Sequence, residues 1–178
     1  MRWFWVDRFT EYVAGDRAVA HKGVTLSDEF IHDHWGGYPV MPNSLIAEGM
    51  AQTSGLLVSE LYKFQELVVL AKFTKLEFDG LVLPGQTLKY TAQIGATKDI
   101  GAQATVTAHV GDHQQAHAEI FFARMHADSA GREEMPEKLF DADDLCHWLH
   151  VTGVFRVGVH QDGSRMHPSE YGLPEYTG

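Results

Sequence analysis

The chain has 178 residues, 44% of them hydrophobic and 21% charged, a composition typical of a soluble globular domain. Its net charge of −10 argues against nucleic acid or an anionic membrane as the main partner, because both repel an acidic surface. The apolar run over residues 1–6 ends at Asp7 and Arg8, too early for a signal peptide, and no stretch is long and apolar enough to cross a membrane. The single cysteine, Cys146, cannot form an internal disulfide, so we expect the protein in the cytoplasm.

The sequence divides into two parts of different charge. Residues 1–126 have a net charge of −4, and residues 127–178 have a net charge of −6. The boundary stretch, residues 127–134, is polar and without periodicity, which is typical of a linker. We therefore predict one main domain over residues 1–126 and an acidic C-terminal extension of unknown role over residues 127–178.

The first part combines strands with one helix. Strand-like runs separated by short turns predict an antiparallel sheet, with strands at residues 18–24, 68–78, 87–94, 102–110 and 116–125. Apolar side chains cover nearly every side of a helix from Ser44 to about Phe64, which predicts that this helix is buried. Gly49 and Gly55 would let another backbone approach it closely. The predicted fold class is α+β, with an antiparallel sheet wrapped around a long central helix.

Two polar residues stand out on this helix. Glu48 and Gln52 lie one turn apart on a single face of its apolar half. No Lys or Arg precedes Lys63 in the helix to neutralise the carboxylate. Burial raises the pKa of a carboxyl group, and a neutral acid near pH 7 is what a general acid catalyst must be. The alternative is that Glu48 faces a polar subunit seam or solvent.

The segment before the helix, residues 32–43, contains two prolines and two glycines, which predicts a rigid irregular loop. It brings His34 close to the helix N-terminus, where unpaired N–H groups can hold a developing negative charge. A base, a protonated acid and an anion-binding site together suit proton abstraction beside a carbonyl with loss of a leaving group. The alternatives are a metal pair of His32 and His34 or chance proximity. Without a third ligand at zinc-site spacing, we expect no metal.

The run from His34 to Gln52 reads HWGGYPVMPNSLIAEGMAQ. It resembles the active-site signature of the bacterial 3-hydroxyacyl-(acyl carrier protein) dehydratases, H-F-P-G-x-P-x-M-P-G-x-L-x-x-E-x-M-A-Q, with the same 14-residue separation of histidine and glutamate. The resemblance extends to residues 6–8, 78–85 and 118–122, and so covers roughly residues 1–126. It implies the hotdog fold, which agrees with the helix and sheet predicted above.

The resemblance implies reversible dehydration of (3R)-3-hydroxyacyl thioesters to trans-2-enoyl thioesters in fatty acid or related lipid or polyketide synthesis, without a cofactor. His34 would remove the C2 proton, and Glu48 would protonate the leaving hydroxyl. In the family these two residues come from opposite subunits of a homodimer, and the dimers commonly assemble as trimers of dimers. A glutamate rather than an aspartate favours a dehydratase over an isomerase.

The same resemblance implies supporting roles for several residues. The backbone carbonyl of Val40 would orient the histidine, the N–H of Asn43 would bind the thioester oxygen, and Gly37 would contribute to backbone positioning. Gln52 would support the glutamate through a hydrogen bond. Asn43 replaces the glycine of the family, and we expect it to tolerate left-handed backbone there. Residues 35–36 replace the family's Phe-Pro.

The identity of the acyl carrier and two other functions stay open. The resemblance implies an acyl thioester substrate carried on acyl carrier protein or coenzyme A. Residues 77–81 include two acidic side chains, and because acyl carrier protein is itself acidic, this rim favours coenzyme A or a specialised carrier protein. One alternative function is a hotdog thioesterase, which would need a carboxylate and a positioned water. The other is a non-catalytic acyl-binding or structural subunit.

The remaining histidines of the first part have an ordinary interpretation. Asp112 and His117 have the D-x4-H spacing of the MaoC-type enoyl-CoA hydratases. They lack the Asn-Pro of that motif and fall on a predicted hairpin turn. His109, His113 and His117 are expected along one strand edge at the surface rather than around a metal.

The C-terminal extension is predicted to contain a short helix. This helix begins after Asp141, carries an apolar stripe and ends near Gly153. The stripe consists of Leu145, Trp148 and Leu149. We expect the helix to dock on the main domain and to be followed by a short strand over residues 154–159; a cover for the acyl channel or a partner contact is the alternative. Cys146 in such a helix is expected to be structural.

Overall fold

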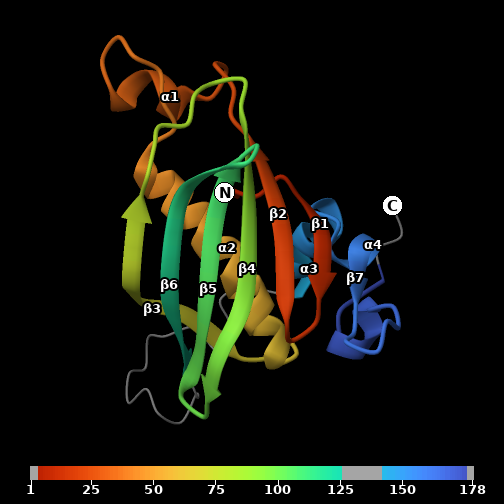
Figure 1. The fold of residues 1–178 in the computed structure, drawn as a ribbon. Coiled ribbons are helices and arrows are strands. Elements are labelled where there is room, and N and C mark those ends of the chain that lie inside the picture. Colours follow the sequence, from red (N-terminus) through yellow and green to blue (C-terminus); the bar gives the residue numbers. More distant parts are fainter. Residues whose placement is uncertain (1–3, 126–141, 176–178) are drawn as a thin grey trace, which may run out of the picture.

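The computed structural model describes residues 4–125 and 142–175 (Figure 1). One seven-stranded sheet runs in the order β3-β6-β5-β4-β2-β1-β7. Its strands are β1 (Arg8–Val13), β2 (Arg17–Gly23), β3 (Leu67–Phe78), β4 (Thr87–Lys98), β5 (Gly101–Val110), β6 (His113–Met125) and β7 (Gly158–Val159). Neighbouring strands are antiparallel except β1 and β7, which pair in parallel. The predicted sheet is confirmed, with β1 as a strand that the sequence did not predict.

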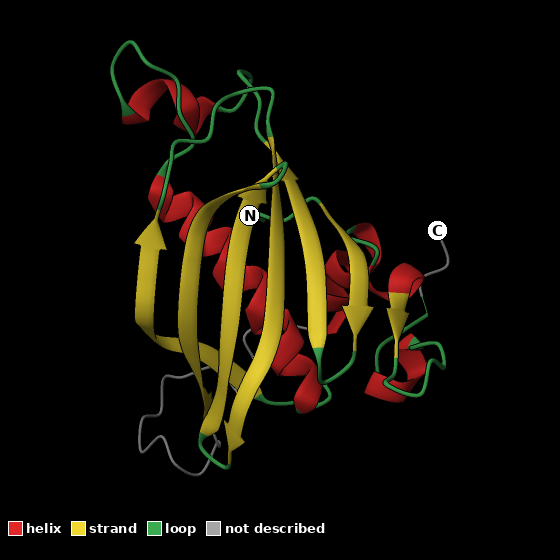
Figure 2. Cartoon of the chain, viewed as in Figure 1, coloured by secondary structure: helices red, strands yellow, loops and turns green. Residues whose placement is uncertain are grey.

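The central helix α2 (Asn43–Leu61) crosses one face of this sheet and packs against β2 to β6 (Figure 2). Its fully buried side chains include Ile46, Met50 and Leu57, and burial of such side chains contributes about 1.5–3 kcal/mol each. The helix ends earlier than predicted because residues 63–64 adopt left-handed backbone with φ of 54°, which no right-handed helix continues. No described helix is long and apolar enough to cross a membrane.

Each of two glycines of α2 leaves room for an aromatic ring. The sequence predicted instead that another backbone would approach the helix there. A Cβ atom at Gly49 would lie 2.4 Å from the hydroxyl oxygen of Tyr90, and a Cβ atom at Gly55 would lie 3.2 Å from Cε1 of Phe122. Tyr90 is on β4 and Phe122 is on β6. The glycines therefore let two inner strands reach the helix through their largest side chains.

The predicted irregular loop before α2 is wrong at its start, because a short helix, α1 (Glu29–His34), occupies that part. Ile31 is fully buried, and the ring of Phe30 meets the ring of Trp5 edge to face with a centroid distance of 4.8 Å. Packing on distant residues thus stabilises a helix that is too short to be stable alone. The helix ends where Trp35 becomes extended, with φ −139° and ψ 103°.

The described part of the C-terminal extension, residues 142–175, packs beside β1 (blue in Figure 1). Besides β7 it contains α3 (Ala142–Val151), α4 (Val154–Val157) and the 3-10 helix η2 (Pro168–Tyr171). The predicted helix is confirmed as α3, and its apolar stripe is buried. Asp141 and the predicted linker lie outside the described residues.

The predicted strand over residues 154–159 is wrong for most of its length. Gly153 adopts a φ of +80°, and its carbonyl oxygen accepts the N–H groups of Arg156 and Val157 at 3.1 and 3.2 Å. These bonds close a helical turn, so only Gly158 and Val159 remain extended and pair with β1.

The two edges of the sheet differ in what covers them. The extension covers the β1 edge, where β7 pairs with β1 and the N–H of Phe9 donates to the carbonyl oxygen of Thr152 at 2.7 Å. At the other edge, no described strand pairs with the outer side of β3. Most side chains of β3 after its first residues are exposed.

Candidate active site

The first turn of α2 presents backbone donors. The carbonyl oxygen of Pro42 accepts the N–H groups of Leu45 and Ile46 at 3.0 and 3.1 Å. The N–H groups of Asn43 and Ser44, both exposed, donate to no backbone carbonyl among the described residues. Such a helix end can hold a developing negative charge. Asn43 has ordinary helical backbone, so this position does not require the left-handed conformation that Asn was expected to tolerate.

A chain of hydrogen bonds holds the carboxylate of Glu48. The side-chain nitrogen Nε2 of Gln52 donates to Oε1 of Glu48 at 2.8 Å. The oxygen Oε1 of Gln52 in turn accepts the backbone N–H of Trp5 at 2.8 Å. Because a backbone N–H can only donate, this second bond fixes the orientation of the Gln52 amide and directs its NH2 group towards Glu48. Sequence reasoning found the Glu48 and Gln52 pair but missed Trp5, which lies far away in the chain.

Glu48 itself is exposed in this chain. The carboxylate therefore does not have the burial that the apolar helix pattern predicted. It corresponds to the alternative interpretation, in which it faces solvent or a subunit seam.

His34 lies at the C-terminal end of α1 and is exposed. Gly37 follows with a φ of +83° and open space where a Cβ atom would be, and Val40 is buried. Among the described residues, no hydrogen bond or ion pair joins His34 to Glu48 or to the carbonyl of Val40. The structure thus places the two predicted catalytic side chains on neighbouring elements but does not join them within one chain.

The other residues singled out by the sequence do not form a second site. Within residues 4–125 and 142–175, no group of three His, Cys, Asp or Glu side chains could hold a metal ion. Asp112 lies in the turn before β6 and His117 lies within β6, with no bond between them. The thiol of Cys146 donates to the carbonyl oxygen of Pro174 at 3.0 Å. Burial raises the pKa of this thiol, which makes it a poor nucleophile.

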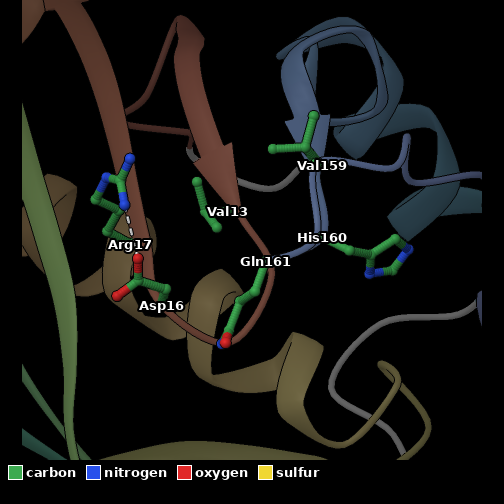
Figure 3. Close-up of a pocket in the computed structure, with 7 residues that line it drawn as sticks. Val13, Asp16, Arg17, Val159, His160 and Gln161 are labelled. Atoms are coloured by element: carbon green, nitrogen blue, oxygen red, sulfur yellow. Dashed lines mark hydrogen bonds and ion pairs between the residues drawn. The ribbon is translucent and has the colours of Figure 1, made fainter.

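A hollow of about 450 Å³ lies between the β1–β2 turn and the extension (Figure 3). Its lining includes Val13, Asp16, Arg17, Val159, His160 and Gln161. Arg17 donates to Glu11 and Asp16 at 2.7 Å, and Nε2 of His160 lies 2.8 Å from a carboxylate oxygen of Glu170. Because Asp16, Arg17 and His160 already have polar partners, we interpret the hollow as the seam where the extension docks. Its two walls are far apart in the sequence, so no local pattern predicts it.

The sheet wrapped around α2 makes this chain a hotdog-fold protein. One similar solved structure is smu.793 from Streptococcus mutans, bound to acetyl-CoA, with a TM-score of 0.58 and 14% identity over 70% of this chain and 93% of that chain. Another is PA5202 from Pseudomonas aeruginosa, with a TM-score of 0.56 and 19% identity over 66% of this chain and 87% of that chain. At these identities the similarity shows the fold alone.

The particular family follows from the sequence comparisons. The family model for the FabA-like domain matches residues 3–119. The 3-hydroxyacyl-(acyl-carrier-protein) dehydratases FabZ of Desulforamulus reducens and Clostridioides difficile are each 34% identical over 119 residues, which is 66% of this chain and 84% of each relative. The chain belongs to the FabA-like domain family. The family match includes His34 and Glu48 and ends before the C-terminal extension.

Proposed function

We propose that this protein dehydrates (3R)-3-hydroxyacyl thioesters to trans-2-enoyl thioesters, and catalyses the reverse hydration, in cytoplasmic fatty acid or related lipid synthesis. Family membership and the dehydratase names of its relatives support this reaction class. The structural observation that carries the proposal is the carboxylate of Glu48, bonded to Gln52 at 2.8 Å. It lies on a helix whose first-turn N–H groups are available to a ligand.

In the proposed reaction, His34 takes the proton from C2 of the substrate while negative charge develops on the thioester oxygen. The N–H of Asn43 donates to that oxygen. Glu48, as the neutral acid, gives its proton to the 3-hydroxyl group as the C3–O bond breaks, so water leaves and a C2–C3 double bond forms. Gln52 donates to one oxygen of Glu48, which leaves the other oxygen to carry the transferred proton.

We propose that the active unit is a homodimer paired along β3, and that dimers can assemble further into trimers of dimers. The outer edge of β3 is unpaired among the described strands, and Leu70 and Leu76 on this strand are exposed. A long exposed edge with apolar side chains is a template for pairing with a second chain. Each site would combine His34 of the partner subunit, oriented by its backbone at residues 37–40, with a Glu48 that the dimer removes from water.

We propose coenzyme A or a specialised carrier protein as the acyl carrier. Glu77 and Asp79, at and just after the end of β3, are both exposed. Glu77 pairs with Lys75 at 3.0 Å, and Asp79 accepts a hydrogen bond from Gln114 at 2.9 Å. Because Lys75 compensates the charge of Glu77, the carboxylate of Asp79 is the one that would repel an acidic carrier protein.

The direct test is hydration of trans-2-enoyl-CoA, followed as loss of the enoyl absorbance and by mass spectrometry of the product. We expect turnover by the wild type and none by His34→Ala or Glu48→Gln, with the oligomeric state unchanged by light scattering. Thiol release that survives His34→Ala would instead support a thioesterase. Absence of reaction with both coenzyme A and carrier-protein substrates would support the non-catalytic role.

The same two variants also test whether each active site contains residues from both subunits. In a mixed dimer of His34→Ala and Glu48→Gln chains, one site has lost both residues and the other has kept both. If mixing gives half mixed dimers by statistics, about a quarter of wild-type activity should return, because one of two sites is intact in half of the dimers. Mixtures that stay inactive despite confirmed subunit exchange would contradict the proposal that each site spans two chains.

A further inference from the structure

The C-terminal extension contacts the segment that holds the candidate acid. Trp148 of α3 is buried, and its ring stacks on the ring of Phe4 with centroids 4.4 Å apart and planes 25° apart. The next residue, Trp5, donates its backbone N–H to Gln52, and Gln52 donates to Glu48, each at 2.8 Å. An unbroken series of contacts thus leads from the extension to the carboxylate.

The segment before β1 is held by the burial of Trp5 and Val6 and by ring contacts of Phe4 and Trp5. β1 begins at Arg8, so Phe4 and Trp5 lie outside the strand ladder. The ring of Trp5 meets Phe30 of α1 edge to face at 4.8 Å, and the stack with Trp148 holds the preceding residue, Phe4. Phe4 is still 42% exposed, so without the stack it has little other burial to keep it in place. A segment outside the strand ladder that loses such a contact opens locally at a lower cost in free energy.

We propose that Trp148 is a positioning residue for Glu48, acting through Phe4, Trp5 and Gln52. The proposal rests on the role of Glu48 as the acid in the proposed function. When the stack is present, the N–H of Trp5 occupies Oε1 of Gln52, so the amide must direct its NH2 group to Glu48. When the stack is lost, the Trp5 N–H is held less firmly on Oε1 of Gln52, so the amide is less strongly oriented towards the carboxylate and the acid moves out of its productive geometry.

The extension therefore has a positioning role in addition to covering the sheet edge. The family match ends at residue 119, so this support for the site comes from a part of the chain that the match does not include. Trp5 also contacts both α1, which carries the histidine of one proposed site, and α2, which carries the glutamate of the other.

The test compares Trp148→Ala with Trp148→Phe, which keeps a ring for stacking, and with Met166→Ala. Met166 is a matched control, since it is buried in the extension but outside the path. We expect Trp148→Ala to lower kcat for enoyl-CoA hydration roughly tenfold with KM changed less than about twofold, because a hydrogen bond to a charged group is weakened. Trp148→Phe should restore most of kcat, and Met166→Ala should leave it within about twofold of wild type.

Two further measurements separate this proposal from a general loss of structure. Hydrogen exchange of the Trp5 backbone amide reports its bond to Gln52 without any assay of activity, and this amide should exchange faster in Trp148→Ala but not in Met166→Ala. In a Gln52→Leu background, Trp148→Ala should have no additional effect on kcat, because the path is already broken.

Unchanged kcat and unchanged Trp5 exchange in Trp148→Ala would overturn the proposal, as would an equal loss of kcat in Met166→Ala. Failure of the proposed function is a different result: the wild-type protein would then hydrate no enoyl thioester. In that case the exchange measurement still decides whether Trp148 holds the Trp5 amide on Gln52.

Discussion

Gly49→Ala is the substitution for which the structure predicts the sharpest loss of stability. Gly49 lies in α2 directly above the ring of Tyr90, which is fully buried. A Cβ atom at this position would lie 2.4 Å from the hydroxyl oxygen, 2.5 Å from Cζ and 2.8 Å from Cε2 of that ring. Favourable contacts between such atoms lie near 3.5–4.0 Å. Tyr90 is on β4, which is flanked by β2 and β5, so the ring has no free direction in which to retreat.

Two opposing effects set how much Gly49→Ala changes the free energy of unfolding. Alanine is favoured over glycine inside a helix by about 1 kcal/mol. Insertion of a methyl group into a well-packed core costs about 1–3 kcal/mol, and contacts this short with three atoms of one rigid ring place the cost at the upper end. We therefore expect Gly49→Ala to lower the free energy of unfolding by about 1–2 kcal/mol. Gly55→Ala is the matched control, since its Cβ atom would lie 3.2 Å from Phe122, and we expect it to stay within about 1 kcal/mol of wild type.

The assay is urea unfolding followed by circular dichroism at one fixed protein concentration, because self-association makes stability depend on concentration. A double-mutant cycle with Tyr90→Leu, which shortens the opposing side chain, isolates the contact. The combined variant should be more stable than the sum of the single effects by at least about 1 kcal/mol. The proposed clash with Tyr90 would be refuted if Gly49→Ala were as stable as wild type. It would also be refuted if the effects of Gly49→Ala and Tyr90→Leu on stability were additive.

Two further predictions concern stability elsewhere in the fold. Tyr171→Phe should lower the free energy of unfolding by about 1.5–3 kcal/mol, because the Tyr171 hydroxyl donates to the buried carboxylate of Glu60 at 3.0 Å; urea unfolding with no change in midpoint would contradict this. Burial, with the charges of Arg8 and Lys89, lowers the pKa of His21 from its ordinary value of 6.5. The unfolded chain therefore binds the proton more readily, so the contribution of His21 to stability is present above pH 6.5 and is lost as the pH falls below it. His21→Gln should show a flatter loss of stability between about pH 7 and 5, and identical slopes would count against the assignment.

The regular elements of the main domain were predictable because their signals are local. The apolar pattern from Ser44 onward identified α2, and the alternating runs identified five of the strands. β1 was not predicted, because its register with β2 shifts between Phe9 and Glu11. A bulge of this kind breaks the two-residue alternation by which a strand is recognised. α1 and α4 were not predicted, because helices this short are stabilised by packing and by backbone hydrogen bonds at their ends and not by the helix propensity of their residues.

The candidate site was predictable to a similar extent. The spacing of Glu48 and Gln52 along one helix face is a local geometric fact, and the structure has the hydrogen bond between them. The sequence left both a buried and an exposed Glu48 open, because an apolar helix pattern does not show which side of the helix the sheet covers. Trp5 could not be predicted either, since a backbone N–H donor leaves no trace in the residue type.

The sequence by itself determined the elements that repeat with a short period, the family, and the two side chains proposed to carry the reaction. Only the tertiary structure decided that the extension covers the β1 edge, that aromatic rings fill the notches at the glycines of α2, and that the segment before β1 connects Trp148 with Glu48. The physical reason is range: periodicity and capping act between residues a few positions apart. Burial, stacking and hydrogen bonds between distant segments depend on the closed fold, which brings those segments together.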